Sequence, residues 1–140
     1  MHRVLISTPI GDLRSGKGGG VEITLNSLVS GLIEKGHSLD IVAPENSKLS
    51  EISEKIQLHH VRGEEQISWQ HQDFYSPVSI PNNSLLPEMI EKALDLGKEA
   101  DIVLNFSYDW LPIWMTLNVN FPIAPVSYTH LTLPTRTVVV

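Results

Sequence analysis

The sequence predicts an α/β fold, with a parallel β-sheet that carries helices on both of its faces. Short apolar runs alternate with segments of helical periodicity, and glycines and prolines stand at the junctions. The length of 140 residues suits one domain, and 41% hydrophobic residues supply a core and argue against a disordered chain. Because a β-loop-α-β unit opens the chain, the expected architecture is Rossmann-like.

A glycine-rich loop separates the first expected strand from the first expected helix. Residues 3–8 form a short, β-branched apolar run, which predicts a buried strand. Residues 9–20 contain five glycines and indicate a loop. Apolar side chains that recur every three or four residues then predict a helix from about Gly19 to Lys35. Gly36 is expected directly after this helix, where a left-handed residue often ends the last turn.

The remainder of the chain continues the alternation of strands and helices. Further strands are expected over residues 38–43, 55–61, 101–105 and 121–124, with a helix from Asn83 or Ser84 to about Lys98 and a short helix within 108–117. Residues 62–82 are polar and predict a long loop, which in a compact domain is usually functional or mobile. Strands joined through helices pair in parallel, so both faces of the sheet should be covered.

Composition excludes several classes of function. A formal charge of −6 gives no basic surface for a nucleic acid. Without cysteine there is no disulfide, thiol nucleophile or Cys-built zinc site. The adjacent His59 and His60 would point to opposite faces of a strand, so they are a poor metal-binding pair, and we expect no metal site. No segment is long and apolar enough to span a membrane and no targeting segment begins the chain, so we expect a cytoplasmic protein.

The glycines before the first helix form the strongest candidate binding site. Gly18, Gly19 and Gly20 lead directly into the helix, where free N–H groups and the helix dipole favour a diphosphate or another anion. Two nucleotide-binding motifs fail here. Gly18 stands where the P-loop requires Ser or Thr after Lys17, and the dinucleotide fingerprint ends on Val21 in place of glycine. The alternative is a mobile loop that binds nothing.

A second candidate site follows the strand expected at 101–105. Residues 105–110 (NFSYDW) combine a carboxamide, a phenol, a carboxylate and two further aromatic rings, and they should lie at the same sheet edge as the glycines. Aromatic faces can stack on a sugar or a planar heterocycle while Asn105 and Asp109 fix its polar groups. The alternative is that Asp109 caps a helix while Phe106 and Trp110 pack in the core. For Phe106 we favour the core.

Several of these segments together resemble a known enzyme family. Residues 4–9 (VLISTP), 18–22 (GGGVE), 32–37 (LIEKGH) and 40–44 (DIVAP) resemble the N-terminal half of the retaining glycosyltransferases of family 4. Residues 101–112 (DIVLNFSYDWLP), with the glycines and the STP triplet, are more narrowly similar to members that glucosylate tetrahydrobiopterin from UDP-glucose.

This resemblance implies a GT-B fold, in which the active site lies between two Rossmann-like domains. The N-terminal domain of the family mostly holds the acceptor and the C-terminal domain the nucleotide sugar. Transfer retains the anomeric configuration and typically needs no metal or other cofactor. The resemblance places Gly18, Gly19 and Gly20 near the diphosphate of the donor, with UDP-glucose as the expected donor. It assigns a small acceptor such as a pterin to Glu22, Asn105, Tyr108, Asp109 and Trp110. It identifies no catalytic residue in this chain.

Residues 1–124 are expected to form the N-terminal domain, and residues 125–140 a non-native tail. Residues 126–135 read as the translation of a transposase sequencing adapter, and the expected C-terminal donor domain is absent. We therefore expect this chain alone to be inactive in sugar transfer. One alternative is that the tail is genuine. Another is that the chain is a stand-alone Rossmann-like or flavodoxin-like module that binds a small ligand without catalysis.

Overall fold

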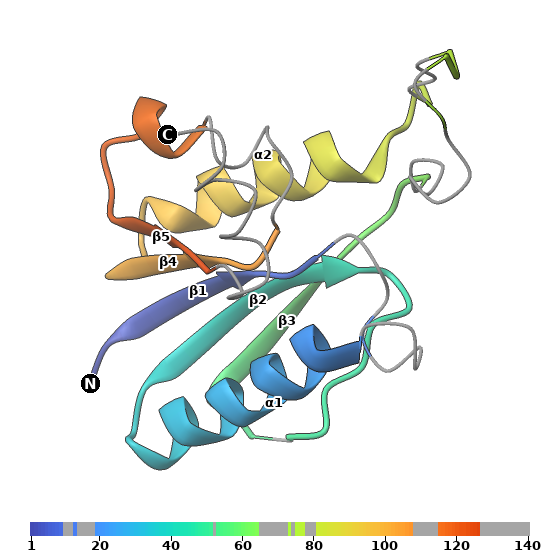
Figure 1. Cartoon of the computed structure of the whole chain (residues 1–140). Coiled ribbons are helices and arrows are strands. Elements are labelled where there is room, and N and C mark those ends of the chain that lie inside the picture. The colour runs from blue at the N-terminus through green and yellow to red at the C-terminus, as the bar shows by residue number, and fades with distance from the viewer. Residues whose placement is uncertain are drawn as a thin grey trace, which may run out of the picture.

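The computed structural model is a five-stranded parallel sheet with one helix on each face (Figure 1). It describes residues 1–9, 13, 19–51, 53–64, 73, 75–77, 81–107 and 115–126. In chain order the elements are β1 (Arg3–Ser7), α1 (Gly19–Glu34), β2 (Ser38–Pro44), β3 (Ile56–Val61), α2 (Leu85–Gly97), β4 (Ile102–Asn105), the 3-10 helix η2 (Thr116–Asn118) and β5 (Ile123–Pro125). The strand order is β3-β2-β1-β4-β5, and every neighbouring pair is parallel. The predicted α/β, Rossmann-like fold class is confirmed.

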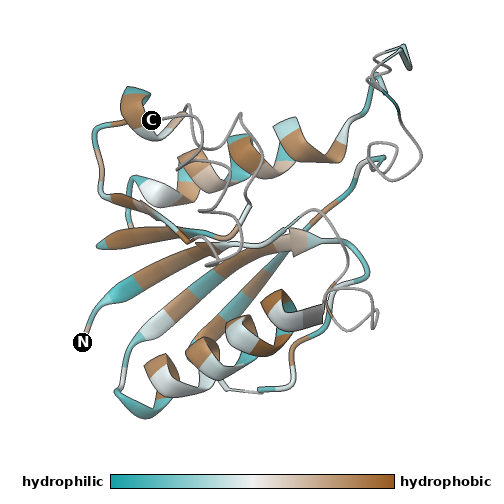
Figure 2. Ribbon diagram, in the orientation of Figure 1, coloured by the Kyte–Doolittle hydropathy of each residue, from teal (hydrophilic) through white to brown (hydrophobic). Residues whose placement is uncertain are grey.

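Alternation along the strands divides the core into two layers. In β1, Val4 and Ile6 belong to the core beneath α1, whereas Leu5 belongs to the core beneath α2. Leu25 of α1 and Met89 of α2 are the corresponding helix residues, and both are almost completely buried. Figure 2 shows the same arrangement as apolar strands between two helices. Burial on both faces explains why these strands read as continuous apolar runs.

The first helix ends as the sequence predicts, but the second begins differently. Gly36 has φ of +83°, which confirms a left-handed residue after α1. Ser84 occupies the N-cap position of α2, yet its hydroxyl makes no cap hydrogen bond and is buried without a partner. The Leu85 N–H donates to the Glu64 carbonyl at 2.9 Å. The Ser84 hydroxyl therefore does not cap α2, and the Glu64 carbonyl of the preceding segment accepts the hydrogen bond from the first helical N–H instead.

The C-terminal part of the described chain bears on two expectations, the short helix within 108–117 and the domain boundary after residue 124. Only Met115 and η2 represent the short helix expected within 108–117, since residues 108–114 lie outside the described residues. β5 runs through Pro125, and the Val126 N–H donates to the Asn105 carbonyl at 2.8 Å. Residues 127–140 also lie outside the described residues. The boundary expected after Ala124 and the non-native tail stay predictions.

Gly63 carries a stability prediction because it lies against the start of α2. A Cβ there would lie 2.5 Å from the Leu85 Cα and 2.8 Å from the Leu85 N. Since these are backbone atoms, relief requires the helix to shift. We expect Gly63→Ala to lower the free energy of unfolding by about 2 kcal/mol in urea denaturation. Gly31→Ala, in the interior of α1 with nothing within 4 Å of its Cβ, should instead stabilise by about 0.5 kcal/mol. Equal effects of the two substitutions would contradict this packing.

Candidate functional site

The carboxyl edge of the sheet contains a topological switch point. From β1 the chain passes through α1 to β2 on one side, while β4 lies on the other side of β1. In open α/β sheets, ligands bind outside the carboxyl ends of the strands at such a point. The ends of β1 and β4 meet there, because the Phe106 N–H donates to the Ser7 carbonyl at 2.9 Å. The topology thus brings to one edge the two strand ends after which the loops singled out in the sequence begin.

The glycine side of this edge is only partly described. Gly19 and Gly20 form the start of α1, as expected, whereas Gly18 lies outside the described residues. A Cβ on Gly20 would meet nothing within 4 Å, so packing among the described residues does not require glycine there. Glu22 lies in the first turn of α1 and is partly exposed. The open space above Gly20 is compatible with close approach of an anionic ligand to the helix start.

On the β4 side, Asn105 is buried and organises the chain that follows it. Its Oδ1 accepts a hydrogen bond from the Ser107 N–H at 3.0 Å, and its Nδ2 donates to the Ser107 carbonyl at 3.1 Å. The carboxamide therefore holds a local turn, and one N–H and one lone pair remain for another partner. Tyr108, Asp109 and Trp110 lie outside the described residues, so their contact with an acceptor stays a prediction.

Phe106 belongs to the core. It is 1% exposed and packs in the layer beneath α1 with Leu25 and Ile41. The prediction that Phe106 packs in the core is confirmed. Direct ligand contact by its ring is excluded by this burial.

A small cavity lies between α2 and the carboxyl ends of the strands. Its volume is about 30 Å³, and its walls include Ser7, Ile90, Leu94, Asn105, Met115 and Phe121. Most of these walls are apolar, and Ser7 and Asn105 supply the polar groups at the strand ends. The cavity was not predictable from the sequence. It requires α2 and residues 115–121 to lie together over the sheet, which no local pattern indicates.

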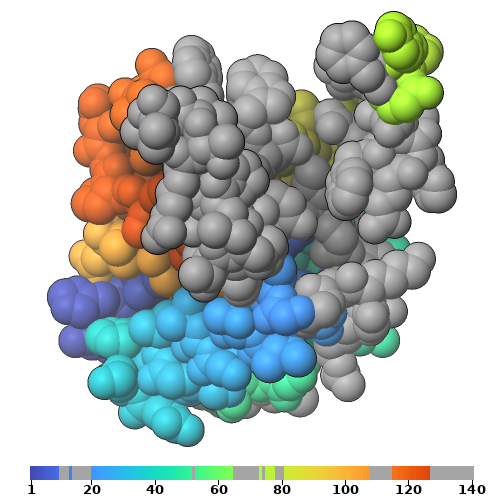
Figure 3. Space-filling view, viewed as in Figure 1, coloured from blue at the N-terminus to red at the C-terminus, as the bar shows by residue number. Residues whose placement is uncertain are grey.

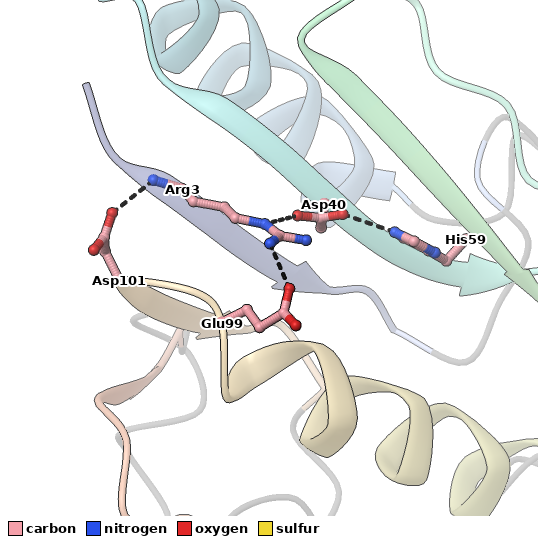
Figure 4. A network of polar contacts seen from close by, with 5 residues as sticks. All are labelled: Arg3, Asp40, His59, Glu99 and Asp101. Atoms are coloured by element: carbon pink, nitrogen blue, oxygen red, sulfur yellow. Dashed lines mark hydrogen bonds and ion pairs between the residues drawn. The ribbon is translucent and has the colours of Figure 1, made fainter.

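A partly buried ionic network lies toward the other end of the sheet (Figure 4). The Arg3 Nε donates to Asp40 Oδ2 at 2.6 Å, and His59 Nε2 lies 2.8 Å from Asp40 Oδ1. Arg3 Nη1 also donates to Glu99 at 2.8 Å, and the Arg3 N–H donates to Asp101 at 2.7 Å. The network joins the starts of β1 and β4 to the middle of β2 and β3.

The charges of this network shift one another's pKa values. Burial alone would raise the pKa of Asp40, whose side chain is 7% exposed, but hydrogen bonds from Arg3 and His59 hold it below its usual value. The pKa of Arg3 is raised, first by its hydrogen bond to Asp40 and then by the one to Glu99. The hydrogen bond from the Arg3 N–H lowers the pKa of Asp101. Asp40 is thus a paired carboxylate at neutral pH.

The network was not predicted from the sequence, although the sequence contains one signal for it. Asp40 interrupts the apolar run of β2, and a buried charge must be paired. Asp40 lies in the middle of the strand and away from the carboxyl edge, which gives it no part in the ligand site. His59 turns toward Asp40 while His60 is exposed, as expected for adjacent strand residues. Among the residues that the structure describes, no three His, Asp or Glu side chains are grouped to hold a metal ion.

Comparison with protein-family models and with curated proteins finds no match for this chain. Within the described ranges, no helix combines the length and apolar character needed to cross a membrane.

Proposed function

We propose that this chain is the acceptor-side half of a glycosyltransferase that moves a sugar from a nucleotide donor to a small planar acceptor. The observation that carries the proposal is the meeting of the ends of β1 and β4 at one switch point. The glycine start of α1 and the turn organised by Asn105 both lie at the carboxyl edge, on either side of the end of β1. The resemblance to family 4 glycosyltransferases supplies the reaction.

In this proposal the two sides of the edge have different ligands. The N–H groups at Gly18–Gly20 approach the diphosphate of the donor, for which UDP-glucose is the proposed molecule. Glu22, Asn105 and residues 108–110 contact the acceptor, for which a pterin is proposed. A flat bicyclic ring stacks well on Tyr108 or Trp110, and Asp109 supplies an acceptor for the ring's N–H groups. A second Rossmann-like domain supplies most of the donor contacts, so the chain alone transfers no sugar.

Residue-resolved binding tests the proposal with the 140-residue chain. In amide NMR spectra, UDP-glucose should shift Gly19 and Gly20, and tetrahydrobiopterin should shift Asn105 and its neighbours. Asp109→Asn should weaken pterin binding about tenfold, the effect of one lost hydrogen bond to a charged group. Asp95→Asn, at an exposed position on α2, is the matched control and should bind as the unchanged chain does.

Three results would overturn the proposal. They are no shift with either ligand, equal pterin affinity in the Asp109 variant, and sugar transfer by the 140-residue chain alone. Saturable binding of flavin mononucleotide at this edge, with no response to UDP-glucose, would favour the stand-alone flavodoxin-like module.

A further inference from the structure

We propose that β3 is an association edge, through which two copies of this chain pair antiparallel to form one continuous sheet. In the sheet that the structure describes, β3 is an outer strand and has β2 as its one neighbour (Figure 1). Residues of the green part of the chain, which includes β3, reach the surface beside α1 in Figure 3. A free edge is a row of backbone donors and acceptors that a further strand can complete. The inference does not depend on the proposed function.

The outward backbone groups of β3 are unpaired within the described part of the chain. The Leu39 N–H donates to the Lys55 carbonyl at 2.8 Å, and Leu39 lies beside Ile56. In a parallel pair, alternate residues direct both backbone groups to the same neighbour, so Lys55 and the residues in step with it face β2. Leu58 and His60 therefore direct their N–H and C=O groups away from the sheet. No described residue forms a hydrogen bond with these groups.

The sequence of β3 does nothing to protect this edge, in contrast to the strand at the opposite edge. Sheets usually protect free edges with charged residues, prolines or very short strands. The six residues of β3 (IQLHHV) include no proline, lysine or acid. The three-residue β5 is preceded by Pro122 and ends on Pro125, which has no N–H to donate. Because each copy offers one usable edge, pairing through it closes at two copies and builds no open filament.

The direction of the backbone groups restricts how the two copies of β3 can pair. Outward groups must meet outward groups, and this occurs when Leu58 lies opposite the second copy's Leu58. Each Leu58 N–H then donates to the other Leu58 carbonyl, and each His60 N–H donates to the other copy's Ile56 carbonyl. Ile56 and Leu58 are partly buried apolar residues of the layer beneath α1. Pairing in this register covers the part of them that is still exposed, which favours association.

Charged residues at the two ends of β3 favour the same register. With Leu58 at the centre, Glu54 lies opposite the second copy's Arg62, and both are exposed. Arg62 is paired with Glu45 of its own chain, but its side chain is 85% exposed and its guanidinium has further N–H groups for a second carboxylate. A shift of two residues in one direction would instead oppose Glu54 to Glu64, which is repulsive. Charge complementarity thus identifies a second copy of this chain as the partner.

The chain has no cysteine, so a single introduced thiol can test the register. Leu58→Cys should give a disulfide-linked dimer on mild oxidation, because opposite residues of a hydrogen-bonded antiparallel pair have Cα atoms about 5.5 Å apart, within the range for a disulfide. His60→Cys is the matched control, since His60 is exposed on the same edge. Its two thiols would lie four positions out of register, about 13 Å apart, and should not cross-link.

Sedimentation velocity tests the edge without a cross-link. The parent should show a reversible monomer–dimer equilibrium between roughly 10 μM and 1 mM, as for a small interface. His60→Pro removes an outward N–H and should abolish the dimer, whereas His60→Ala keeps this N–H and should associate as the parent does. Glu54→Arg should weaken the dimer about tenfold, and the added Arg62→Glu should restore it.

Several results would overturn the association edge. They are a parent that stays monomeric at about 1 mM, a dimer that His60→Pro leaves unchanged, assemblies that keep growing with concentration, and a cross-link in His60→Cys but not in Leu58→Cys. Far-UV circular dichroism establishes that each variant is folded. If His60→Pro does not fold, the exposed charge variants decide, and a dimer that neither Glu54→Arg weakens nor the double exchange restores would equally overturn the proposal.

Discussion

Replacing Asp40 by alanine is expected to lower the free energy of unfolding by about 3 kcal/mol, measured by urea denaturation at neutral pH. The substitution removes the common partner of Arg3 and His59, whose bonds to the carboxylate measure 2.6 and 2.8 Å. His59 then loses its partner in a site where its side chain is 14% exposed. Arg3 is 36% exposed and keeps Glu99, so the effect should fall at the low end for a broken buried pair.

The pH dependence of unfolding separates this charge effect from a general loss of packing. The pKa of Asp40 is lower in the folded state than in the unfolded chain, where it is about 3.9. Its contribution is therefore fully present above about pH 4 and is lost as the pH falls through the folded-state value. The difference in free energy of unfolding between the parent and Asp40→Asn should therefore become smaller below pH 4.

The control for this network is Asp95→Ala, which removes an exposed carboxylate paired with Lys98 on α2. Its effect should stay within about 0.5 kcal/mol at any pH, as for other exposed ion pairs. Two outcomes would show that the network contributes no electrostatic stability. One is a difference in free energy of unfolding between the parent and Asp40→Asn that stays constant from pH 7 to pH 2. The other is an equal loss of stability in Asp40→Ala and Asp95→Ala.

The contrast between α1 and this network shows what local sequence can predict. The limits of α1 and the left-handed Gly36 follow from periodicity and from one glycine, which are features of neighbouring residues. Arg3 and Asp40 are 37 residues apart, and Asp40 and His59 are 19 apart. Their pairing depends on strand register, because β1, β2 and β3 must lie side by side in that order. Local periodicity predicts a strand but does not determine its neighbour.

The same distinction applies to the candidate site. That the glycines and Asn105 lie at one edge was predictable, since all carboxyl ends of a parallel sheet face the same way. The hydrogen bonds between the Asn105 carboxamide and the Ser107 backbone were not predictable, because the partner of Asn105 depends on the path of the chain after β4. Ser7 likewise reads as an ordinary strand end. Its place in the wall of the cavity depends on the packing of α2 and residues 115–121 over the sheet.

Phe106→Ala is expected to lower the free energy of unfolding by about 4 kcal/mol, in the range for a buried phenylalanine replaced by alanine. Phe106 is among the largest completely buried side chains of the described chain, and its loss would leave a cavity in the layer beneath α1. The total free energy of unfolding of a domain of this size is only about 5–15 kcal/mol, so the variant should be close to unfolding. Urea denaturation followed by circular dichroism measures the loss.

The matched control is Leu117→Ala, which removes an apolar side chain that is 85% exposed on η2 and should change stability by less than about 0.5 kcal/mol. The comparison also bears on function, since Phe106 stands between Asn105 and the residues proposed to contact the acceptor. If Phe106 serves only the core, Phe106→Leu should regain much of the lost stability and bind tetrahydrobiopterin as the parent does. A stability loss below 1 kcal/mol in Phe106→Ala, together with weaker pterin binding in Phe106→Leu, would move this ring from the core to the ligand site.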